Sequence, residues 1–258
     1  MDYLSELFNL KGKVAVVIGA GGFLCSEMAR SLAKVGVKVA ILDKNVETIK
    51  KTAADIKASG GVALDCVIDV VDKNSHKSAL DKVVNEFGNV NILINGAGIN
   101  APTPFLDIKL EEWNSILAVH VTGTMLGCQV FGEHMIKNNG GSIINMSSAS
   151  AGPALSKAFT YSVAKAGIKN LTQNLAREWA PYNVRVNALR PGFFPTEWSM
   201  KNFIDPSREK AILGHTPMKR YGRPQELTGA VLWLLSDAAS FVTGVEIKVD
   251  GGFSCMTI

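Results

Sequence analysis

Cysteines and metal-binding patterns are scarce in this chain. Its four cysteines lie far apart and form no CxxC pair: Cys25, Cys66, Cys128 and Cys255. Its four histidines form no HxxxH pair, so we predict no metal site. Isolated cysteines without a disulfide pattern are typical of proteins from a reducing compartment, and the sequence therefore predicts a cytoplasmic protein.

Charge of one sign and long apolar runs are scarce as well. The 27 Lys and Arg residues oppose 23 Asp and Glu, a net charge of +4 without a basic block. Nucleic-acid binding usually needs a concentrated basic face, so we predict no nucleic-acid partner. No uninterrupted apolar stretch is long enough for a membrane span, and the segment MDYLSELFNLKGK lacks the pattern of a signal peptide. We therefore expect no membrane partner.

The arrangement of the apolar segments indicates one large core. The chain has 258 residues, 47% of them apolar, and no linker, internal repeat or change in charge divides it. Strand-like runs alternate with helical patterns, and they fall near residues 13–18, 37–42, 62–68, 90–94, 141–146, 184–189 and 244–249. This alternation predicts a single α/β domain over residues 1–258, a doubly wound sheet of about seven parallel strands with helices on both faces.

A glycine-rich loop follows the first of these strands. Val14–Ile18 is a short apolar run rich in β-branched residues, as expected for a strand buried on both faces. Gly19, Gly21 and Gly22 interrupt it, and a helical pattern then runs from about Leu24 to Val35. Glycines let backbone N–H groups approach a pyrophosphate, and the helix N-terminus adds a favourable dipole. The segment therefore predicts a phosphate-binding loop.

An acidic residue ends the next apolar run, Val37–Leu42. Asp43 lies 24 residues after Gly19, near the position where an acid accepts hydrogen bonds from the ribose hydroxyls of a dinucleotide. A carboxylate there repels a 2′-phosphate, which favours NAD(H) over NADP(H), although Lys44 follows directly. Strand, loop, helix, strand and acid in this order predict a domain that binds NAD(H).

Tyr161 and Lys165 stand four residues apart in the run YSVAK, and Ser148 precedes Tyr161 by 13 residues. On a helix, residues four apart share a face, with Cβ atoms about 5–6 Å apart. A lysine ammonium beside a phenol lowers the tyrosine pKa from about 10. The Ser148 hydroxyl could bind the oxygen that gains or loses the proton. The pattern favours proton transfer, with an ordinary amphipathic helix as the alternative.

In these motifs the chain resembles the short-chain dehydrogenase/reductase family. The family's TGxxxGxG loop corresponds to residues 18–25, where Gly19 is kept and Ile18, Phe23 and Cys25 replace the usual threonine and two glycines. The resemblance implies a Rossmann-type fold and hydride transfer between a nicotinamide and a secondary alcohol or ketone. The replacements leave a second interpretation open, a non-catalytic dinucleotide-binding protein. The intact serine, tyrosine and lysine favour an enzyme.

Further motifs carry the resemblance over nearly the whole chain. NILINGAG at 91–98 resembles the family's NNAG segment, Asp69-Val70 the end of the third strand beside the adenine, RPG at 190–192 the motif beside the nicotinamide, and VDGG at 249–252 the closing strand and turn. The resemblance implies the following cofactor-binding residues: Gly19, Gly21, Gly22, Phe23, Leu24, Asp43, Asp69, Val70, Asn95, Ala97, Gly98, Tyr161, Lys165, Pro191, Gly192, Phe194 and Thr196.

The resemblance also implies four catalytic residues. Tyr161 would donate a proton to the developing alkoxide, and Ser148 would hydrogen-bond the same oxygen. Lys165 would lower the tyrosine pKa and hold the nicotinamide ribose. The fourth family position is an asparagine that anchors a water in a proton path, and His120 stands there in the segment EEWNSILAVHVTGT. A histidine could hold such a water and exchange its proton near neutrality; a half-buried structural histidine is the alternative.

Residues 193–223 correspond to the flap that closes over substrate in this family. Its cations are candidate partners for a carboxylate, or solvated charges of a mobile flap: Lys201, Arg208, Lys210 and His215. The segments PGFFPTE, HTPMKRYG and LLSDAASFVTGVEIKVDGGFS resemble the subgroup of fructuronate and mannonate reductases, with gluconate 5-dehydrogenases close by. The resemblance therefore implies a sugar-acid substrate, with a hydroxysteroid or acyl-carrier ketoreductase as the alternative.

The same family commonly forms dimers and tetramers through its long fourth and fifth helices and its C-terminal segment. The matching elements carry apolar residues at helical spacing: Ile116, Leu117, Met125, Leu126, Leu171, Leu175, Trp179, Phe253 and Met256. The resemblance implies a homo-oligomer, either a dimer or a tetramer. A buried core face needs the same spacing, so the pattern alone does not separate interface from core.

Overall fold

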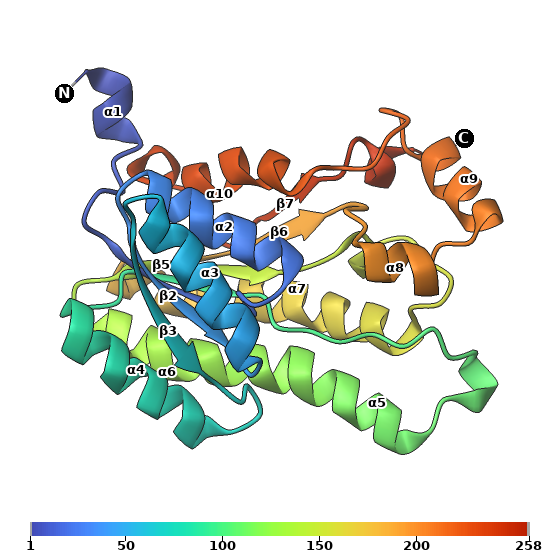
Figure 1. Cartoon of the computed structure of the whole chain (residues 1–258), viewed down its shortest axis with the longest axis horizontal. Coiled ribbons are helices and arrows are strands. Elements are labelled where there is room, and N and C mark those ends of the chain that lie inside the picture. Colours follow the sequence, from blue (N-terminus) through green and yellow to red (C-terminus); the bar gives the residue numbers. More distant parts are fainter. Residues whose placement is uncertain (1, 257–258) are drawn as a thin grey trace.

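The computed structural model describes residues 2–256 and contains a seven-stranded sheet. Every neighbouring pair of strands is parallel, and their order is β3-β2-β1-β4-β5-β6-β7 (Figure 1). The strands are β1 (Val14–Ile18), β2 (Lys38–Asp43), β3 (Val62–Val67), β4 (Ile92–Asn95), β5 (Gly141–Met146), β6 (Val184–Pro191) and β7 (Glu246–Val249). All seven predicted strands are confirmed, with ends that differ by at most two residues.

Helices occupy most of the connections between strands. They are α1 (Tyr3–Leu7), α2 (Phe23–Lys34), α3 (Val46–Ala58), α4 (Lys73–Phe87), α5 (Leu110–Leu117), α6 (Gly123–Lys137), α7 (Phe159–Trp179), α8 (Glu197–Asn202), α9 (Pro206–His215) and α10 (Thr228–Leu235). The predicted first helix after the glycine loop is confirmed as α2. Gly36 follows it with φ +84°, a backbone conformation that suits glycine at the end of a helix.

Each face of the sheet is covered by its own layer of helices (Figure 1). Side chains of α2, α3 and α10 pack on one face, and those of α4, α6 and α7 on the other. Strand β1 packs against both layers of helices because its successive side chains alternate between the two faces of the sheet. Ala15 and Val17 pack with the first layer, and Val14, Val16 and Ile18 pack with the second. All of β1 is buried, which explains its unbroken apolar run.

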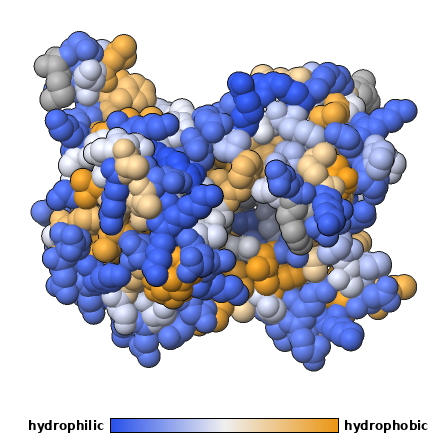
Figure 2. Space-filling model, in the orientation of Figure 1, coloured by the Kyte–Doolittle hydropathy of each residue, from blue (hydrophilic) through white to orange (hydrophobic). Residues whose placement is uncertain are grey.

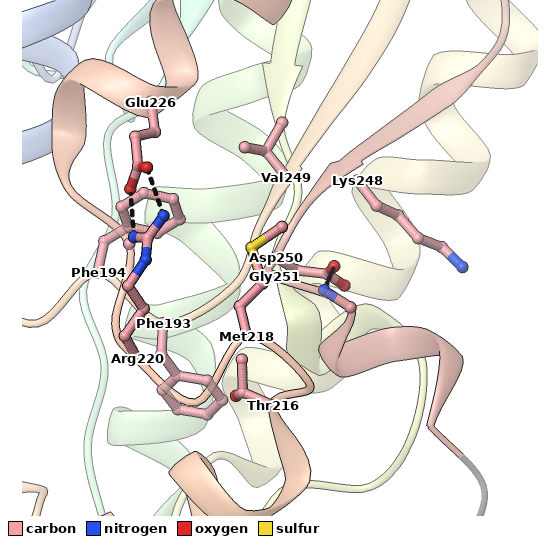
Figure 3. Close-up of a pocket in the computed structure, with 12 residues that line it drawn as sticks. Phe193, Phe194, Thr216, Met218, Arg220, Glu226, Lys248, Val249, Asp250 and Gly251 are labelled. Atoms are coloured by element: carbon pink, nitrogen blue, oxygen red, sulfur yellow. Dashed lines mark hydrogen bonds and ion pairs between the residues drawn. The ribbon is translucent and has the colours of Figure 1, made fainter.

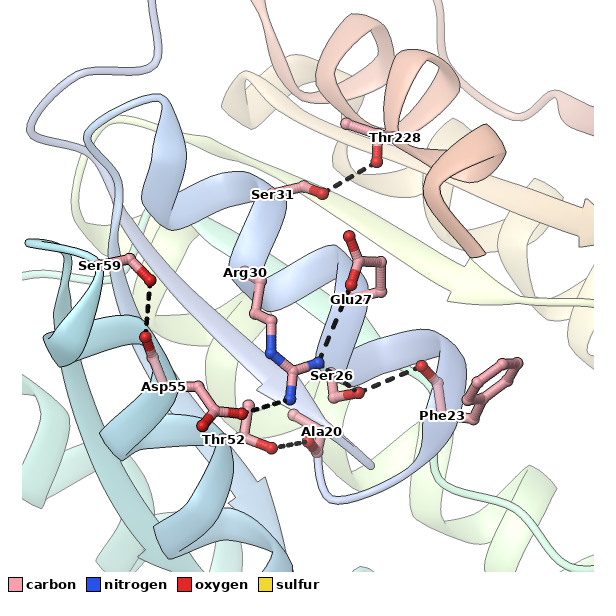
Figure 4. Close-up of polar contacts among 10 residues, drawn as sticks. All are labelled: Ala20, Phe23, Ser26, Glu27, Arg30, Ser31, Thr52, Asp55, Ser59 and Thr228. Carbon is pink, nitrogen blue, oxygen red and sulfur yellow. Dashed lines mark hydrogen bonds and ion pairs between the residues drawn. The ribbon is translucent and has the colours of Figure 1, made fainter. Parts of the chain in front are cut away.

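Polar contacts connect the helices of the first layer (Figure 4). Arg30 of α2 donates to Asp55 of α3 with an N···O distance of 2.9 Å. The hydroxyl oxygens of Ser31 and Thr228 lie 2.9 Å apart, which joins α2 to α10. From α3, Thr52 donates to the carbonyl of the loop residue Ala20. These contacts orient α2 and the glycine loop that precedes it.

Helices α5 and α6 continue into one another through a π-helical turn at Ala118–Thr122. The continuous helix, Leu110–Lys137, is long and apolar enough to cross a membrane by length and composition alone, which the sequence analysis did not expect. In its most apolar window 56% of the residues are buried inside the fold, and Cys128, Phe131 and Met135 belong to the core. The apolar character of this helix therefore serves the packing of α6 against the sheet.

The segment 193–223 folds around α8 and α9, which lie beyond the end of β6 at the right of Figure 1. Both helices begin at a side-chain cap. Thr196 Oγ1 accepts a hydrogen bond from the Ser199 N–H at 3.1 Å, and Asp205 Oδ1 accepts one from the Arg208 N–H at 2.9 Å. The predicted flap thus has helical structure of its own.

Four of the apolar residues predicted for an interface are core residues instead. Their exposed fractions are 3% for Ile116, 7% for Leu126, 8% for Trp179 and 5% for Phe253. Trp179 and Leu175 pack with the second layer of helices. At these positions the helical spacing of the apolar residues therefore indicates burial in the core of the chain.

Candidate active site

A cavity of about 720 Å³ opens at the carboxyl ends of four strands. Gly19 follows β1, Gly96 follows β4, Ser147 follows β5 and Gly192 follows β6, and all four residues line it. The strand order reverses between β1 and β4, and open α/β sheets bind ligands at such a reversal. Figure 2 shows the surface hollowed near the middle of this face of the molecule.

Ser148, Tyr161 and Lys165 meet in this cavity. Ser148 lies two residues beyond β5 and hydrogen-bonds the side chain of Tyr161. Tyr161 and Lys165 lie in the first turns of α7, and the Lys165 Nζ is 5.5 Å from the centroid of the tyrosine ring. The structure therefore brings together the hydroxyl, phenol and ammonium groups that the sequence analysis selected for proton transfer.

Tyr161 differs from expectation in its pKa. Burial raises the pKa of Tyr161 above its ordinary value of 10.0, and the hydrogen bond from Ser148 opposes this shift. The predicted lowering by Lys165 is therefore wrong for this structure. The Lys165 ammonium points to the end of β5, where it donates to the carbonyl of Met146 at 2.6 Å. Desolvation of the phenolate is the largest cause of the shift.

Lys165 is a buried cation, only 4% exposed. Burial lowers the pKa of Lys165 from 10.5 to about 8, because surroundings of low dielectric constant disfavour the charged form. The ammonium is still the main form at neutral pH. Its bond to Met146 uses one of three N–H donors, so two remain for groups of a ligand in the cavity.

His120 lies in the π-helical turn and is 1% exposed. Its ring stands edge-on to Tyr161, with centroids 5.1 Å apart. Burial and the charge of Lys165 lower the pKa of His120 from 6.5 to about 3, and the hydrogen bond to Ile99 opposes the shift. The expected proton exchange near neutrality is therefore wrong, because the ring is neutral there. The structure favours the alternative of a structural histidine.

The backbone of the glycine loop lies so close to neighbouring residues that two of its positions have no room for a side chain. Gly19 has φ +83°, and a Cβ atom there would lie 2.6 Å from the backbone nitrogen of Ala97. A Cβ atom on Gly21 would lie 2.3 Å from the hydroxyl of Thr48. Side chains at either position would displace the loop. The close approach of backbone N–H groups to the cavity suits a phosphate ligand.

The start of α2 forms one side of the cavity. Gly22, Phe23, Leu24 and Cys25 all line it, as predicted for three of them. Gly22 is the N-cap residue and gives no side-chain hydrogen bond to the helix. Phe23 is 45% exposed. A Cβ atom on Gly96 would lie 2.2 Å from the Cys25 sulfur, so this sulfur fills the helix–strand contact.

Asp43 ends β2 beside the glycine loop. Its Oδ2 accepts a hydrogen bond from the Gly21 N–H at 3.2 Å, and its Oδ1 one from the Asn45 N–H at 3.1 Å. Asp43 and Gly21 are not among the described residues that line the cavity, although Gly22, the residue after Gly21, does line it. A carboxylate has about four acceptor sites, so Asp43 can accept further donors from a ligand.

Asn95 is the clearest correction among the predicted cofactor residues. Its side chain is 5% exposed and donates to Asn145 Oδ1 at 2.9 Å, inside the core. Ala97 packs against the second layer of helices. Of the predicted residues in this segment, Gly98 lines the cavity. The segment therefore contributes its backbone, while the Asn95 side chain holds β4 to β5.

Asp69 and Val70 lie two and three residues beyond the end of β3, not at its end as predicted. Asp69 Oδ1 accepts a hydrogen bond from the Val71 N–H at 3.1 Å. The carbonyl of Val70 is 2.9 Å from Nε2 of His76. Neither of the two predicted residues lines the cavity within the described ranges. They form a turn at the same edge of the sheet.

The predicted residues at the end of β6 and just after it all line the cavity: Pro191, Gly192, Phe194 and Thr196. Pro191 is the last residue of β6. A Cβ atom on Gly192 would lie 2.6 Å from the Cα atom of Asp250. Only a residue without a side chain therefore fits at position 192, where the backbone runs close to the turn after β7.

Two cations that line the cavity, Lys157 and Arg208, lie where α9 meets the loop before α7. Arg208 on α9 donates to the hydroxyl and the carbonyl of Ser156 at 2.5 and 2.8 Å. Lys157 has φ +58°, and its Nζ lies 3.2 Å from Asp205 Oδ2. Arg208 was a predicted candidate, whereas Lys157 was missed, because nothing in the sequence distinguishes it from a surface lysine. These contacts hold α9 against the loop before α7.

The three other candidate cations lie elsewhere. Lys201 and Lys210 are exposed and are absent from the described lining of the cavity. The ring of His215 packs edge-on against Phe253, with centroids 4.8 Å apart. The structure therefore selects Arg208 from the predicted set.

A second cavity, of about 380 Å³, shares Phe193 and Phe194 with the first (Figure 3). Arg220 and Glu226 form two hydrogen bonds there, at 2.8 and 2.7 Å. Asp250 accepts two backbone N–H groups of its own turn. The ion pair and the turn account for these charges, and the proton-transfer groups lie in the first cavity. Within residues 2–256, no group of three His, Cys, Asp or Glu side chains is placed to hold a metal ion.

Known proteins match this chain along almost its whole length. The family model described as "Enoyl-(Acyl carrier protein) reductase" matches residues 22–254. The "Uncharacterized oxidoreductase UxuB" of Bacillus subtilis is 40% identical, over 95% of this chain and 96% of that protein. The "D-threitol dehydrogenase" of Mycolicibacterium smegmatis is 36% identical, over 96% of this chain and 95% of that protein.

A solved structure shares the complete fold. It is a gluconate 5-dehydrogenase from Burkholderia cenocepacia in complex with NADP and tartrate, with a TM-score of 0.94 and 30% identity over 99% of this chain and 100% of that chain. The match covers the sheet, the glycine loop and the segment that carries Ser148, Tyr161 and Lys165. This chain therefore belongs to the short-chain dehydrogenase/reductase family, and it is an oxidoreductase that acts on CH–OH groups with NAD(P).

Proposed function

We propose that this protein interconverts a secondary alcohol and a ketone of a sugar acid, with NAD(H) as the cofactor. The observation that carries the proposal is the placement of Ser148, Tyr161 and Lys165 in one cavity that Arg208 also lines. The first three residues supply proton transfer at a hydroxyl or carbonyl oxygen. The guanidinium supplies a partner for a carboxylate of the same substrate.

The proton chemistry follows from the surroundings of Tyr161. In the reductive direction Tyr161 donates its phenolic proton to the developing alkoxide, and Ser148 donates a hydrogen bond to the same oxygen. In the oxidative direction the phenolate removes the proton of the substrate hydroxyl. The ammonium of Lys165 can hold a ribose hydroxyl with its remaining N–H donors. When bound, the nicotinamide accepts or supplies the hydride.

The cofactor would lie along the glycine loop. Gly19 and Gly22 expose backbone to the cavity, and the crowded space around Gly19 leaves room only for a residue without a side chain. Asp43, at the carboxyl end of β2, would accept the adenosine ribose hydroxyls and repel a 2′-phosphate. We therefore propose NAD(H), although the Burkholderia cenocepacia relative was solved with NADP.

The proposed substrate class rests on Arg208, a cation that lines the cavity. Burial lowers the pKa of Arg208, and Asp205 opposes this shift, so the guanidinium is a partly desolvated cation in the lining of the same cavity. The solved relative is a gluconate 5-dehydrogenase that holds tartrate, a hydroxy acid. We propose that Arg208 binds the carboxylate of an acid of this type and that residues 193–223 close over it.

A neutral polyol is the second candidate substrate. The 36% identity with a D-threitol dehydrogenase favours it, because such a substrate has the same secondary alcohol without the carboxylate. The ketoreductase alternative, a steroid or acyl-carrier substrate, has less support, because two cations, Lys157 and Arg208, line the cavity. A homo-oligomer and a cytoplasmic location are part of the same proposal and rest on the family resemblance.

The deciding experiment is a substrate panel followed by NADH absorbance. Uronates, aldonates, keto acids and neutral polyols are assayed with purified protein, in both directions and with both NAD(H) and NADP(H). The proposal expects the highest kcat/KM for a sugar acid with NAD(H), and no turnover by Tyr161→Phe. A higher kcat/KM for a neutral polyol would replace the sugar acid, and activity retained in Tyr161→Phe would overturn the mechanism.

A further inference from the structure

A buried ion pair joins β6 and β7 next to the loop that carries Ser148. Arg190 is on β6 and Glu246 on β7, with Nη1 and Oε2 3.1 Å apart. Their side chains are 5% and 9% exposed. Ala188 lies opposite Glu246 in the strand register, so Arg190, two residues further on, projects from the same face of the sheet.

Both members of the pair also bind the loop. Glu246 Oε1 accepts a hydrogen bond from the Ser147 hydroxyl at 2.6 Å. Arg190 Nη2 donates to the carbonyl of Ala149 at 3.0 Å. Ser148 is the residue between these two anchored neighbours. A continuous path of polar contacts therefore runs from Ser147 through the ion pair to Ala149 and encloses Ser148.

The guanidinium group fits its place closely. A Cβ atom on Gly152 would lie 2.0 Å from Arg190 Nη2, so the missing side chain at position 152 makes room for it. Arginine holds its N–H donors in a rigid fork. It can therefore bind the carboxylate of Glu246 and the carbonyl of Ala149 at the same time, through different nitrogen atoms.

We propose that Arg190 and Glu246 are positioning residues that fix the direction of the Ser148 hydroxyl toward the reacting oxygen. The inference rests on the proposed function, because the direction of this hydroxyl matters only if the substrate oxygen binds beside Tyr161. Stability alone does not require such a pair, since replacing a buried ion pair by apolar residues of similar volume is often neutral or stabilising. A catalytic group misplaced by about 1 Å can lower the rate by about a hundredfold.

The test removes both anchors while it keeps the volume of the pair. We expect the double variant R190M/E246M to remain folded, to bind NADH with the wild-type Kd and to lose about ten- to a hundredfold in kcat. Amide hydrogen exchange in residues 147–152 should become faster, with or without substrate. Arg190→Lys should be intermediate in kcat, because it keeps the charge of the pair but not the fork.

Arg185 provides a matched control on the same strand. Its guanidinium donates to the carbonyls of Val242 and Ser236, both at 3.3 Å, and does not contact the Ser148 loop. Arg185→Met should change Tm while kcat and the exchange of residues 147–152 stay at wild-type values. Equal losses of kcat in Arg185→Met and Arg190→Lys would mean that any buried arginine of β6 has this effect, and the inference would be wrong.

The remaining outcomes separate the inference from the proposed function. A folded R190M/E246M protein with wild-type kcat and wild-type exchange would overturn the positioning role. If this variant does not fold, Arg190→Lys decides, and an unchanged kcat in that protein overturns the role as well. If the wild type turns over no substrate of the panel, the proposed function fails instead, and the exchange of residues 147–152 still tests the anchoring.

Discussion

The imidazole Nε2 of His120 lies within hydrogen-bond distance of both backbone groups of Ile99, 2.7 Å from the carbonyl oxygen and 3.1 Å from the amide nitrogen. With its proton on Nε2 the ring donates to the carbonyl, and in the other tautomer Nε2 accepts from the N–H. A Cβ atom on Gly98 would lie 2.2 Å from the ring. The histidine therefore holds the segment after β4 against the π-helical turn.

His120→Asn should keep the pH–rate profile of the wild type between about pH 6 and 8, because neither residue titrates there. Its stability should respond less to acid. The folded pKa of His120 is about 3 and its ordinary value is 6.5, so the unfolded state binds the extra proton between these values. The wild type should lose up to about 1.4 kcal/mol per pH unit as the pH falls below 6.5. Urea titrations at several pH values measure this, and parallel losses in both proteins would contradict it.

Ser148→Ala should shift the pH dependence of alcohol oxidation to higher pH. The Ser148 hydrogen bond lowers the pKa of Tyr161 against the effect of burial, so its removal raises that pKa. Oxidation needs the phenolate, and the pH of half-maximal rate therefore rises. The lost donor should also lower kcat by about 10²–10³-fold. An unchanged pH profile, measured by stopped-flow absorbance, would contradict the role of Ser148.

Asp43→Ala should weaken NADH binding by about ten- to a hundredfold. Hydrogen bonds to charged groups contribute about 1.5–3 kcal/mol each, and about 1.4 kcal/mol corresponds to a factor of ten in Kd. Fluorescence titration with NADH measures the change. Asp81→Ala, an exposed aspartate of α4, is the control and should bind NADH as the wild type does. A wild type that prefers NADPH would show that the assignment of Asp43 is wrong.

Arg208→Met should raise KM for a sugar acid by about tenfold or more, the effect of losing one charge-assisted hydrogen bond. KM for a neutral polyol should stay unchanged, because no carboxylate is involved. Lys210→Met changes the same charge on the same helix at an exposed position outside the described cavity lining, and it should affect neither substrate. Equal changes in KM for acid and polyol would assign Arg208 to flap structure alone.

Light scattering should return a multiple of the chain mass of 27.6 kDa at micromolar concentration. Apolar side chains that remain exposed include Phe159 and Val163 at the start of α7, 45% and 51% exposed, and Phe105, whose ring packs at a tilt against that of Phe159. Val163→Glu should shift the population toward the monomer, because an interface would bury the new charge. A monomeric wild type would rule out the oligomer.

The strands and the proton-transfer residues could be predicted because local patterns report them. The run Val14–Ile18 is apolar throughout since both of its faces are buried, and YSVAK places two side chains on one helix face wherever that helix lies. Lys157 could not be found in this way. Its position at the cavity depends on a left-handed backbone and on an aspartate 48 residues away.

The pKa values also lay beyond sequence reasoning. Motif spacing placed a cation near Tyr161, but burial decides the sign of the shift. Burial also determines the pKa of His120, whose ring is neutral at neutral pH because it is removed from solvent. Asn95 shows a related limit, because the motif places the following Gly96 at the cavity while the Asn95 side chain turns into the core. Sequence patterns locate residues on elements, and packing then sets their charge and direction.

The buried ammonium of Lys165 bears on whether a related protein with the same fold is also an active enzyme. Its pKa of about 8 means that the folded state holds the proton less firmly than an unfolded chain does. The charged lysine therefore makes the fold less stable at neutral pH than an apolar side chain of the same length would. Selection for stability alone would therefore remove the charged lysine, because the fold itself does not require a charged group at this position. A relative with an uncharged residue at this position should fold equally well, and similarity of fold would not reveal that its chemistry had been lost.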